Sequence, residues 1–216
     1  NKNIVEKLEA IMKTKEIIEK NTKWIVLFLC IILIIGIIED LLDKEIDKLD
    51  VAGYNLVSEY LISDNVTPIA KGITQLGGAI FLIGLSITLA IVIKNKKIGI
   101  LIWGNIAIST LLNQILKFII QRPRPTEFRI IDERGYSFPS GHSMISATFY
   151  GFLIYLIYKN VKNKYLKYSL ITMLIILILL IGTSRIYLGV HYTSDVLAGF
   201  LIAISYLIIF ITVADL

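Results

Sequence analysis

Six long runs of apolar residues constrain what this 216-residue chain can fold into. A helix needs about 20 residues to cross a hydrocarbon core of about 30 Å, and most of the runs approach that length. Only helices or closed barrels can span lipid, and these runs are continuous rather than alternating, which favours helices. We therefore predict an all-α, polytopic membrane protein with six transmembrane helices. The runs cover approximately residues 24–38, 73–93, 98–120, 141–158, 168–184 and 190–214.

The composition excludes an ordinary soluble domain. Hydrophobic residues make up 56% of the chain and charged residues only 18%, and a soluble domain of this length has no use for several uncharged apolar runs. The one cysteine, Cys30, lies in the first run and cannot form an intramolecular disulfide. The formal net charge of +5 comes with lysines at the ends of the runs, so we predict no nucleic-acid partner.

These lysines predict the orientation of the chain. Residues 1–23 contain six lysines, residues 94–97 contain three, and residues 159–167 contain four. With six spans the three segments share one side, which the positive-inside rule assigns to the cytoplasm. Segment 41–62 then lies outside, where we expect an amphipathic helix that either gates the substrate or caps the bundle.

The N-terminal segment has the pattern of a surface helix. Ile4, Leu8, Ile11 and Ile18 fall on one helical face among lysines and glutamates. We predict that residues 1–23 form a cytoplasmic amphipathic segment on the inner membrane surface, followed by a membrane domain over 24–214. No small-residue cleavage site follows the first span, so we expect it to be retained.

Residues 121–139 place four arginines on the predicted outer side, against the usual charge bias. Lys117, Arg185, His191 and Asp195 also fall at the outward ends of predicted helices. Ionisable groups are expensive in a membrane, so a cluster at one depth indicates a shared site. A solvated loop is the alternative explanation for the arginines alone.

Prolines shape this loop. Pro123 and Pro125 end the third helix and should turn Arg124 towards Lys117. Pro139 then precedes the predicted start of the fourth helix. The residues at that start are Ser140, Gly141 and His142.

The start of the fourth helix is suited to binding an anion. A helix N-terminus offers free N–H groups to anions, Ser140 is a good N-cap, and Gly141 allows close backbone approach. Three cations beside such a terminus require a doubly charged guest, and phosphate fits best.

Both histidines of the chain lie beside these cations. His191 and Asp195 are four residues apart at a predicted helix start and should lie on one face. A carboxylate bound to one ring nitrogen leaves the other free to attack, so His191 is the predicted nucleophile. His142 has no such carboxylate and suits the role of an acid that protonates a leaving oxygen.

Other chemistries use the same residue types. His142, His191 and Asp195 could form a two-histidine, one-carboxylate iron site, but three nearby cations would repel the metal. Ser140 or Ser143 with a histidine and an aspartate could transfer acyl groups, but that reaction has no use for the cations. A lipid-phosphate transporter would use the cations but has no need of a nucleophile.

Three segments in this order resemble the signature of the type 2 phosphatidic acid phosphatases. They are KFIIQRPRP at 117–125, PSGH at 139–142 and SRIYLGVHYTSD at 184–195. That superfamily also includes haloperoxidases and bacterial acid phosphatases, and a haloperoxidase is the less fitting alternative for a membrane chain. The six-helix plan and segment 67–78 extend the likeness to bacterial membrane members such as phosphatidylglycerophosphatase B and undecaprenyl-diphosphate phosphatases.

The resemblance implies a role for each matching residue. His191 becomes the phosphohistidine, Asp195 supports it, and His142 protonates the leaving group. The family needs no metal, so we expect no metal and no cofactor. The phosphate-holding residues would be Lys117, Arg124, Ser140, Gly141, His142 and Arg185.

The expected function is a metal-independent membrane lipid phosphatase that acts at the outer leaflet, with a role in phospholipid metabolism or cell wall biogenesis. Undecaprenyl diphosphate and phosphatidylglycerol phosphate are the favoured substrates. Phosphatidate, diacylglycerol diphosphate and lipid phosphotransfer remain alternatives, because the motifs bind only the shared phosphate. The sequence predicts no oligomeric state.

Overall fold

The computed structural model of the protein describes residues 2–43 and 47–215, with side chains over 21–43 and 48–215. Over these residues the chain forms helices and connecting loops, with no strand. The all-α prediction is therefore confirmed. The helices are α1 (Lys2–Leu42), α2 (Asp47–Tyr60), α3 (Thr67–Gln75), α4 (Ala79–Val92), α5 (Lys96–Ile120), α6 (Gly141–Asn160), α7 (Lys164–Tyr187) and α8 (Thr193–Val213).

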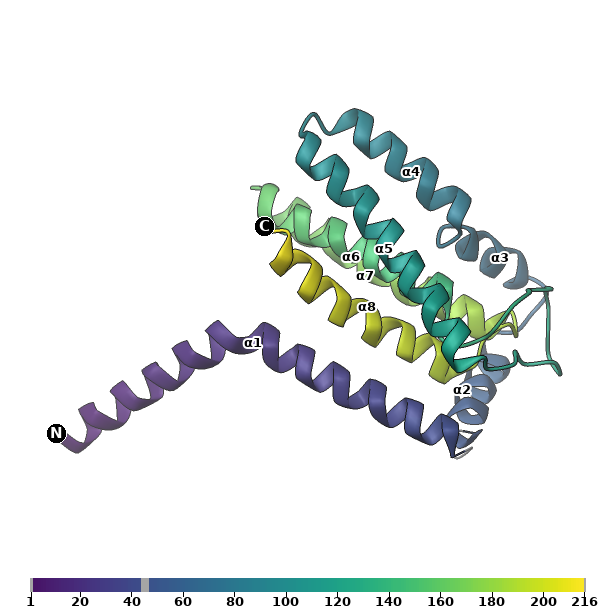
Figure 1. Cartoon of the computed structure of the whole chain (residues 1–216), viewed down its shortest axis with the longest axis horizontal. Helices are drawn as coiled ribbons and strands as arrows, with labels where there is room; N and C mark the ends of the chain where they lie inside the picture. The colour runs from purple at the N-terminus through teal and green to yellow at the C-terminus, as the bar shows by residue number, and fades with distance from the viewer. Residues whose placement is uncertain (1, 44–46, 216) are drawn as a thin grey trace.

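The long helices run side by side as a bundle, with α6 packed against α5, α7 and α8 (Figure 1). The short helices α2 and α3 sit at one end of this bundle, next to the loop of residues 121–140. We call this the loop end. The turns after α4 and α6 lie at the opposite end, which we call the lysine end because Lys94, Lys96, Lys97, Lys159 and Lys162 are there.

Four helices of the described chain are long and apolar enough to cross a membrane, or five if α3 and α4 form one bent span. The four are residues 21–42 of α1 together with α5, α7 and α8. The predicted run 73–93 is instead broken between α3 and α4, whose axes differ by 48°. Gly77 and Gly78 lie at this break.

The fourth predicted run, now α6, does not qualify as a span by composition. The reason is its position inside the bundle, where helices surround it. Its buried residues include the polar side chains of Ser143, Ser146 and Thr148, which would be costly against lipid but are tolerated against protein. The prediction of six spans is therefore not confirmed at this helix and stays a prediction.

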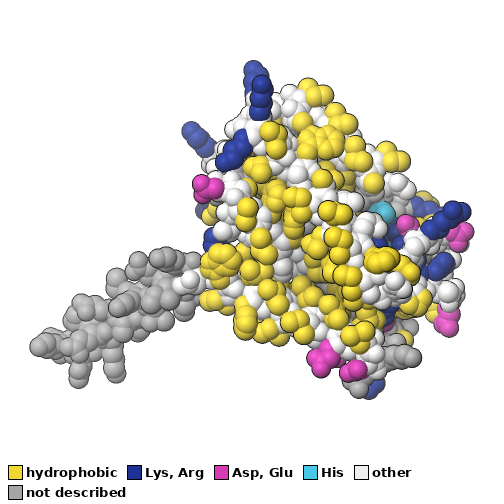
Figure 2. All heavy atoms as spheres, viewed as in Figure 1, with side chains coloured by type: hydrophobic (Ala, Val, Ile, Leu, Met, Phe, Trp, Pro, Cys, Tyr) yellow, Lys and Arg dark blue, Asp and Glu magenta, His cyan; other side chains and the backbone are white. Residues whose placement is uncertain are grey.

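The surface of the bundle suits lipid. Apolar side chains spread over the middle of the face in Figure 2, with charged groups at both ends. In α1, Phe28 is 63% exposed and Leu33 54% exposed, which a water-facing helix would not favour. α1 begins at Lys2 and continues through the first span, so within the described residues no helix boundary separates 2–23 from the rest. Asn1 and the side chains of 2–20 lie outside the described residues, and the surface position of this segment stays a prediction.

An apolar cluster holds the loop end together. Val57 of α2 and Ala70 of α3 pack with Leu188 and Val190 of the α7–α8 turn and with Val196 of α8. α2 falls within the predicted amphipathic segment 41–62 and lies over α7 and α8. This packing fixes the short α7–α8 turn, residues 188–192, which carries His191.

Candidate active site

A cavity of about 510 Å³ opens at the loop end of the bundle. Its polar wall is formed by Lys117, Arg124, Gly141, His142 and His191. Further polar side chains also line it, from Thr110, Asn113, Gln114, Glu133, Arg134 and Tyr136, and the rest of the wall is mainly apolar. The apolar residues come from α4, α5 and α6 and are Leu82, Ile83, Ile106, Phe118 and Ile145. Five of the eight predicted site residues therefore meet at one cavity, although they come from α5, α6 and two loops.

Backbone carbonyls hold the two cations of the first motif in place. Lys117 Nζ donates to the carbonyls of Tyr136 and Ser137, at 2.5 and 3.2 Å. Arg124 donates to the carbonyls of Gly135, Arg134 and Val190, at 3.0, 3.1 and 2.9 Å. Carbonyl oxygens orient these cations without cancelling their charge. Both remain able to bind an anion in the cavity.

The start of α6 forms as the sequence predicts. Ser140 caps the helix, because its side chain accepts a hydrogen bond from the Ser143 N–H. The Ser140 N–H donates to the carbonyl of Asp195 at 3.1 Å, which ties the loop to α8. A Cβ at Gly141 would lie 3.1 Å from Asn113 Oδ1, so glycine allows the close approach of α5 there. The positive end of the α6 dipole is thereby directed at the cavity.

Arg185 belongs to the last turn of α7, not to a loop after it, and is 1% exposed. Its guanidinium donates to Thr74 of α3 at 2.8 Å and to Glu133 of the loop at 2.9 Å. Its Nε has no partner among the described atoms and is a buried donor available to a ligand. Burial alone would raise the pKa of Glu133, but the hydrogen bond and charge of Arg185 outweigh it, so this pKa lies below its usual range.

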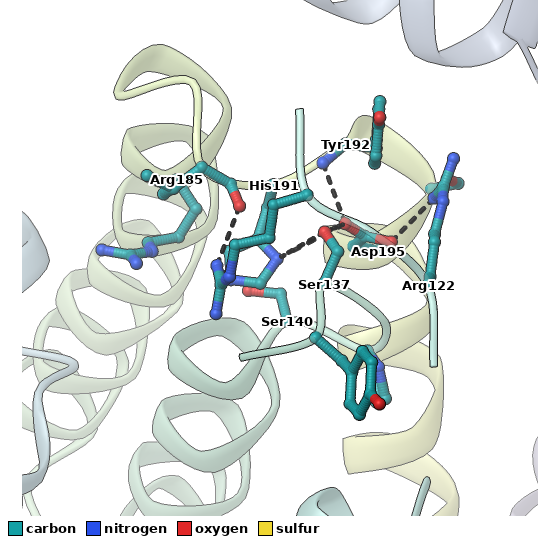
Figure 3. Close-up of polar contacts among 12 residues, drawn as sticks. Arg122, Ser137, Ser140, Arg185, His191, Tyr192 and Asp195 are labelled. Carbon is teal, nitrogen blue, oxygen red and sulfur yellow. Dashed lines mark hydrogen bonds and ion pairs between the residues drawn. The ribbon is translucent and has the colours of Figure 1, made fainter. Parts of the chain in front are cut away.

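His191 and Asp195 do meet, but not on one face of a helix as the sequence analysis predicted. α8 begins at Thr193, so His191 lies in the turn before it. Asp195 instead reaches back across the helix start, where its Oδ2 accepts from the Tyr192 N–H at 2.9 Å. The same oxygen lies 3.4 Å from His191 Nδ1 and accepts from the Ser137 hydroxyl (Figure 3). Helix capping, rather than helical spacing, therefore produces the pair.

The contacts of His191 define its tautomer. Arg124 Nη1 lies 3.0 Å from His191 Nε2, and because a guanidinium only donates, Nε2 carries the lone pair. The proton is then on Nδ1 and faces Asp195. Burial lowers the pKa of His191 to about 4, against the opposing hydrogen bond and charge of Asp195. The charges of Arg124 and Arg185 act in the same direction as burial, so the ring is neutral at physiological pH.

Several residues of this site were not singled out from the sequence. Ser137 and Arg122 contact Asp195, Asp50 contacts Arg122, and Thr74 and Glu133 hold Arg185. Arg122 at least belongs to the arginine cluster of the loop, but no pattern marks Asp50 or Thr74. Among the described side chains, no group of three or more His, Cys, Asp or Glu is placed to hold a metal ion. The iron-site alternative therefore gains no support.

The segment from α5 to α8 matches a known family model. The PAP2 superfamily model covers residues 99–215, which is more than half of the chain and contains every predicted site residue. The chain belongs to the PAP2 superfamily. The resemblance stated from the sequence motifs is thereby confirmed.

Two curated PAP2 relatives extend the match. The chain is 32% identical over 136 residues to phosphatidylglycerophosphatase B of Bacillus subtilis, covering 61% of this chain and 67% of that protein. It is 29% identical over 189 residues to an undecaprenyl-diphosphatase of Sulfolobus acidocaldarius, covering 83% of this chain and 84% of that one. The second match reaches beyond the family model.

Solved structures agree with the fold. A crystal structure of a transmembrane PAP2-type phosphatidylglycerolphosphate phosphatase from Bacillus subtilis is similar with a TM-score of 0.75 and 26% identity, over 90% of this chain and 96% of that one. Aquifex aeolicus LpxE is similar with a TM-score of 0.64 and 25% identity, over 76% and 95% of the two chains. The chain is therefore a multi-pass membrane protein of this superfamily.

Proposed function

We propose that this protein is a metal-independent lipid phosphatase that hydrolyses a lipid phosphate or diphosphate monoester through a phosphohistidine at His191. The observation that carries the proposal is the convergence of both histidines, Lys117 and Arg124 on one cavity. That cavity has an apolar wall on the side of α4 and α5. Such a site suits a phosphate whose alkyl chains remain among lipids.

Cations and the α6 N-terminus would hold the phosphate. Arg124 and Lys117, which line the cavity, would supply donors to its oxygens, as arginine forks commonly do for phosphate. Arg185 lies behind the cavity wall, and its unpartnered Nε would be a further donor. The phosphate would attract the Arg124 donor that now faces His191 Nε2. This releases the lone pair of Nε2 for attack.

In the first step His191 Nε2 would attack phosphorus and form a P–N bond while the bond to the lipid oxygen breaks. The Nδ1 proton stays on the ring and faces Asp195, which stabilises the positive charge that develops. His142 would supply the proton to the leaving oxygen. In the second step a water loses a proton to His142 and attacks phosphorus, and the P–N bond breaks to free inorganic phosphate.

The substrate class follows from the walls of the cavity and from the relatives. The named relatives favour phosphatidylglycerol phosphate and undecaprenyl diphosphate. Phosphatidate and diacylglycerol diphosphate carry the same reacting group, and transfer of phosphate to an acceptor other than water would share the first step. A lipid-phosphate transporter would use the same cations but would release no phosphate.

Phosphate release from these four lipids, measured on the purified protein in detergent with excess EDTA, tests the proposal. We expect turnover of at least one lipid with no loss on addition of EDTA. Orthovanadate should inhibit well below the substrate concentration needed for half-saturation, because a five-coordinate adduct on His191 resembles the transition state. Binding without phosphate release would identify a transporter, and turnover restored by added Mg²⁺, Fe²⁺ or Zn²⁺ would identify a metal enzyme.

We also propose that the loop end faces away from the cytoplasm. The lysines gathered at the other end support this orientation, because cytoplasmic loops carry an excess of positive charge. In a Cys30→Ser background, Arg134→Cys should react with an impermeant maleimide in intact cells, whereas Lys97→Cys should not. The reverse labelling pattern would place the active site in the cytoplasm.

A further inference from the structure

Arg122 lies between two buried carboxylates that come from distant parts of the chain. Its Nη2 donates to Asp50 of α2 at 2.6 Å, and its Nη1 donates to Asp195 of α8 at 2.7 Å. The side chains of Asp50, Arg122 and Asp195 are 5%, 8% and 0% exposed. Figure 3 shows Asp195 between His191 on one side and Arg122 on the other.

Arg122 is placed differently from Arg124, although the two are only two residues apart. Arg124 lines the cavity and contacts His191, whereas Arg122 is absent from the cavity wall and stacks on the ring of Tyr192, 3.9 Å from its centre. Two carboxylates already use its guanidinium, and Ser194 accepts a further hydrogen bond at 2.8 Å. Arg122 therefore has no route to the phosphate, and its effect on the reaction must pass through Asp195.

The two oxygens of Asp195 have separate partners. Oδ1 accepts from Arg122, while Oδ2 accepts from Ser137 and Tyr192 and faces His191 Nδ1. Holding Oδ1 fixes the rotation of the carboxylate, so that Oδ2 stays directed at the histidine. The positive charge of Arg122 also limits how strongly Asp195 raises the basicity of the imidazole. Burial alone would lower the pKa of Arg122, but Asp195 and Asp50 together raise it, so it remains charged.

Asp50 completes the arrangement from α2. One of its oxygens accepts from Arg122, and the other accepts from the Ser194 N–H at the first turn of α8, at 2.8 Å. It therefore holds both the arginine and the start of the helix that carries Asp195. A carboxylate at this place in the membrane domain would be costly without such partners.

We propose that Arg122 and Asp50 are positioning residues that hold Asp195 in the orientation needed to support His191 as nucleophile. The inference rests on the proposed phosphohistidine chemistry. It adds that α2, through Asp50, helps to hold the active site in place. Other charged or titratable groups also face His191 from the surrounding elements. These are Asp195 of α8, Arg124 of the loop, Arg185 of α7, His142 of α6 and Lys117 of α5.

Steady-state kinetics of Arg122→Gln and Asp50→Asn in detergent provide the first test. Because neither residue touches phosphate, we expect kcat to fall about 100-fold and about tenfold respectively, with KM within about threefold of the wild type. The double variant should be no slower than Arg122→Gln alone, because Asp50→Asn keeps an amide oxygen for the Ser194 N–H and removes only the effect of Asp50 that passes through Arg122. Fully additive losses, an unchanged kcat, or a raised KM with unchanged kcat would each overturn the proposal.

The matched control variants change exposed residues at the loop end. Asp64→Asn removes a carboxylate near α2, and Arg129→Gln removes a guanidinium from the same loop, and both side chains are exposed. Both variants should keep wild-type kcat and KM. Arg122→Lys keeps the charge but cannot bridge two carboxylates, so its kcat should lie between those of the wild type and Arg122→Gln.

Imidazole NMR gives a measure that does not depend on turnover. The chain has two histidines, so ¹⁵N-histidine labelling yields two ring systems, and a His142→Gln variant assigns them. Loss of Arg122 removes the positive charge that offsets the Asp195 carboxylate, so the pKa of His191 should rise by about one unit in Arg122→Gln. A folded Arg122→Gln protein with an unshifted His191 would contradict the proposal. If Arg122→Gln does not fold, the kinetics of Asp50→Asn test the proposal instead, and an unchanged kcat in that variant would contradict it.

These readouts separate two kinds of failure. If the wild type releases no phosphate from any lipid, the proposed function fails, while the NMR shift still tests whether Arg122 acts on His191 through Asp195. If the wild type is active but the variants keep its kcat, only the positioning role fails.

Discussion

In the interior of the bundle, away from the loop end, the helices meet through rings and branched side chains, as where Phe152 and Phe210 pack edge to face at 5.6 Å. At the loop end the same helices meet through buried charges such as Arg122, Asp195 and Arg185. Apolar packing is non-directional and tolerates substitutions of similar volume. A buried charge tolerates only a partner at the correct distance and angle. The interior therefore gives the fold its stability, and the loop end holds the proposed active site.

The largest loss of activity should follow a substitution at the loop end, that of His191, the proposed nucleophile. We expect His191→Ala to reduce phosphate release at least about 1,000-fold while leaving the protein folded, because the proposed covalent step needs the Nε2 lone pair. Retention of more than about a tenth of wild-type activity would contradict a phosphohistidine. Thermal unfolding of the same variant in detergent checks that the bundle is intact.

His142 offers a related comparison within the site. His142→Ala should slow hydrolysis of lipid esters strongly but spare substrates with good leaving groups, which need little protonation. Equal losses for both kinds of substrate would exclude the role of general acid.

The next largest loss of activity should come from a substitution of Arg185, which should weaken substrate binding as well as slow the reaction. Arg185→Gln removes a charge and the free Nε donor, so we expect kcat/KM to fall about 100-fold with a clear rise in KM. This outcome contrasts with Arg122→Gln, for which KM should hold. An unchanged KM for Arg185→Gln would place Arg185 outside the phosphate site.

Alanine substitutions at two glycines test whether the loop end and the interior differ in how well they tolerate an added methyl group. A Cβ at Gly199 of α8 would lie 3.2 to 3.3 Å from the Ser140 carbonyl and from Ser143 and Met144 of α6, atoms which cannot move easily. At Gly151, in the interior of α6, a Cβ would lie 2.5 Å from Leu207 Cδ1, but this atom is the flexible end of its side chain and can move away. Gly199→Ala should therefore destabilise the protein by about 1–3 kcal/mol and lower activity, whereas Gly151→Ala should do neither. Thermal unfolding measures the stability of each variant, and phosphate release measures its activity. Equal losses in the two variants would show that both regions tolerate the added methyl group equally well.

The smallest expected effect concerns pH. His191 has a pKa of about 4, lowered chiefly by burial, so it stays neutral and able to attack when the pH falls from 7 to 5. The contribution of His191 to kcat/KM, which reports groups of the free enzyme, should change by less than about threefold over this range, whereas a histidine of ordinary pKa would lose about 25-fold. A steep acid loss in the wild type that is centred near pH 6.5 would show that His191 is not held in a buried, neutral state.

The sequence alone determined the helical membrane class, the family and the motifs that we propose bind phosphate. These features are local: apolar runs reveal helices, and Ser140 before Gly141 reveals a helix start that α6 then adopts. It also grouped Lys117, Arg124, His142 and His191, because the ends of successive helices fall at the same depth. The roles of these residues in catalysis stay predictions.

Only the tertiary structure decided what surrounds these motifs. It showed that α6 is enclosed by other helices, that α3 and α4 break near Gly77, and that His191 precedes α8 rather than starting it. It also brought Asp50 to Arg122 across 72 residues of chain, and Thr74 to Arg185 across 111. No periodicity or spacing encodes such contacts, because each depends on the packing of whole helices and on the need of every buried charge for a partner.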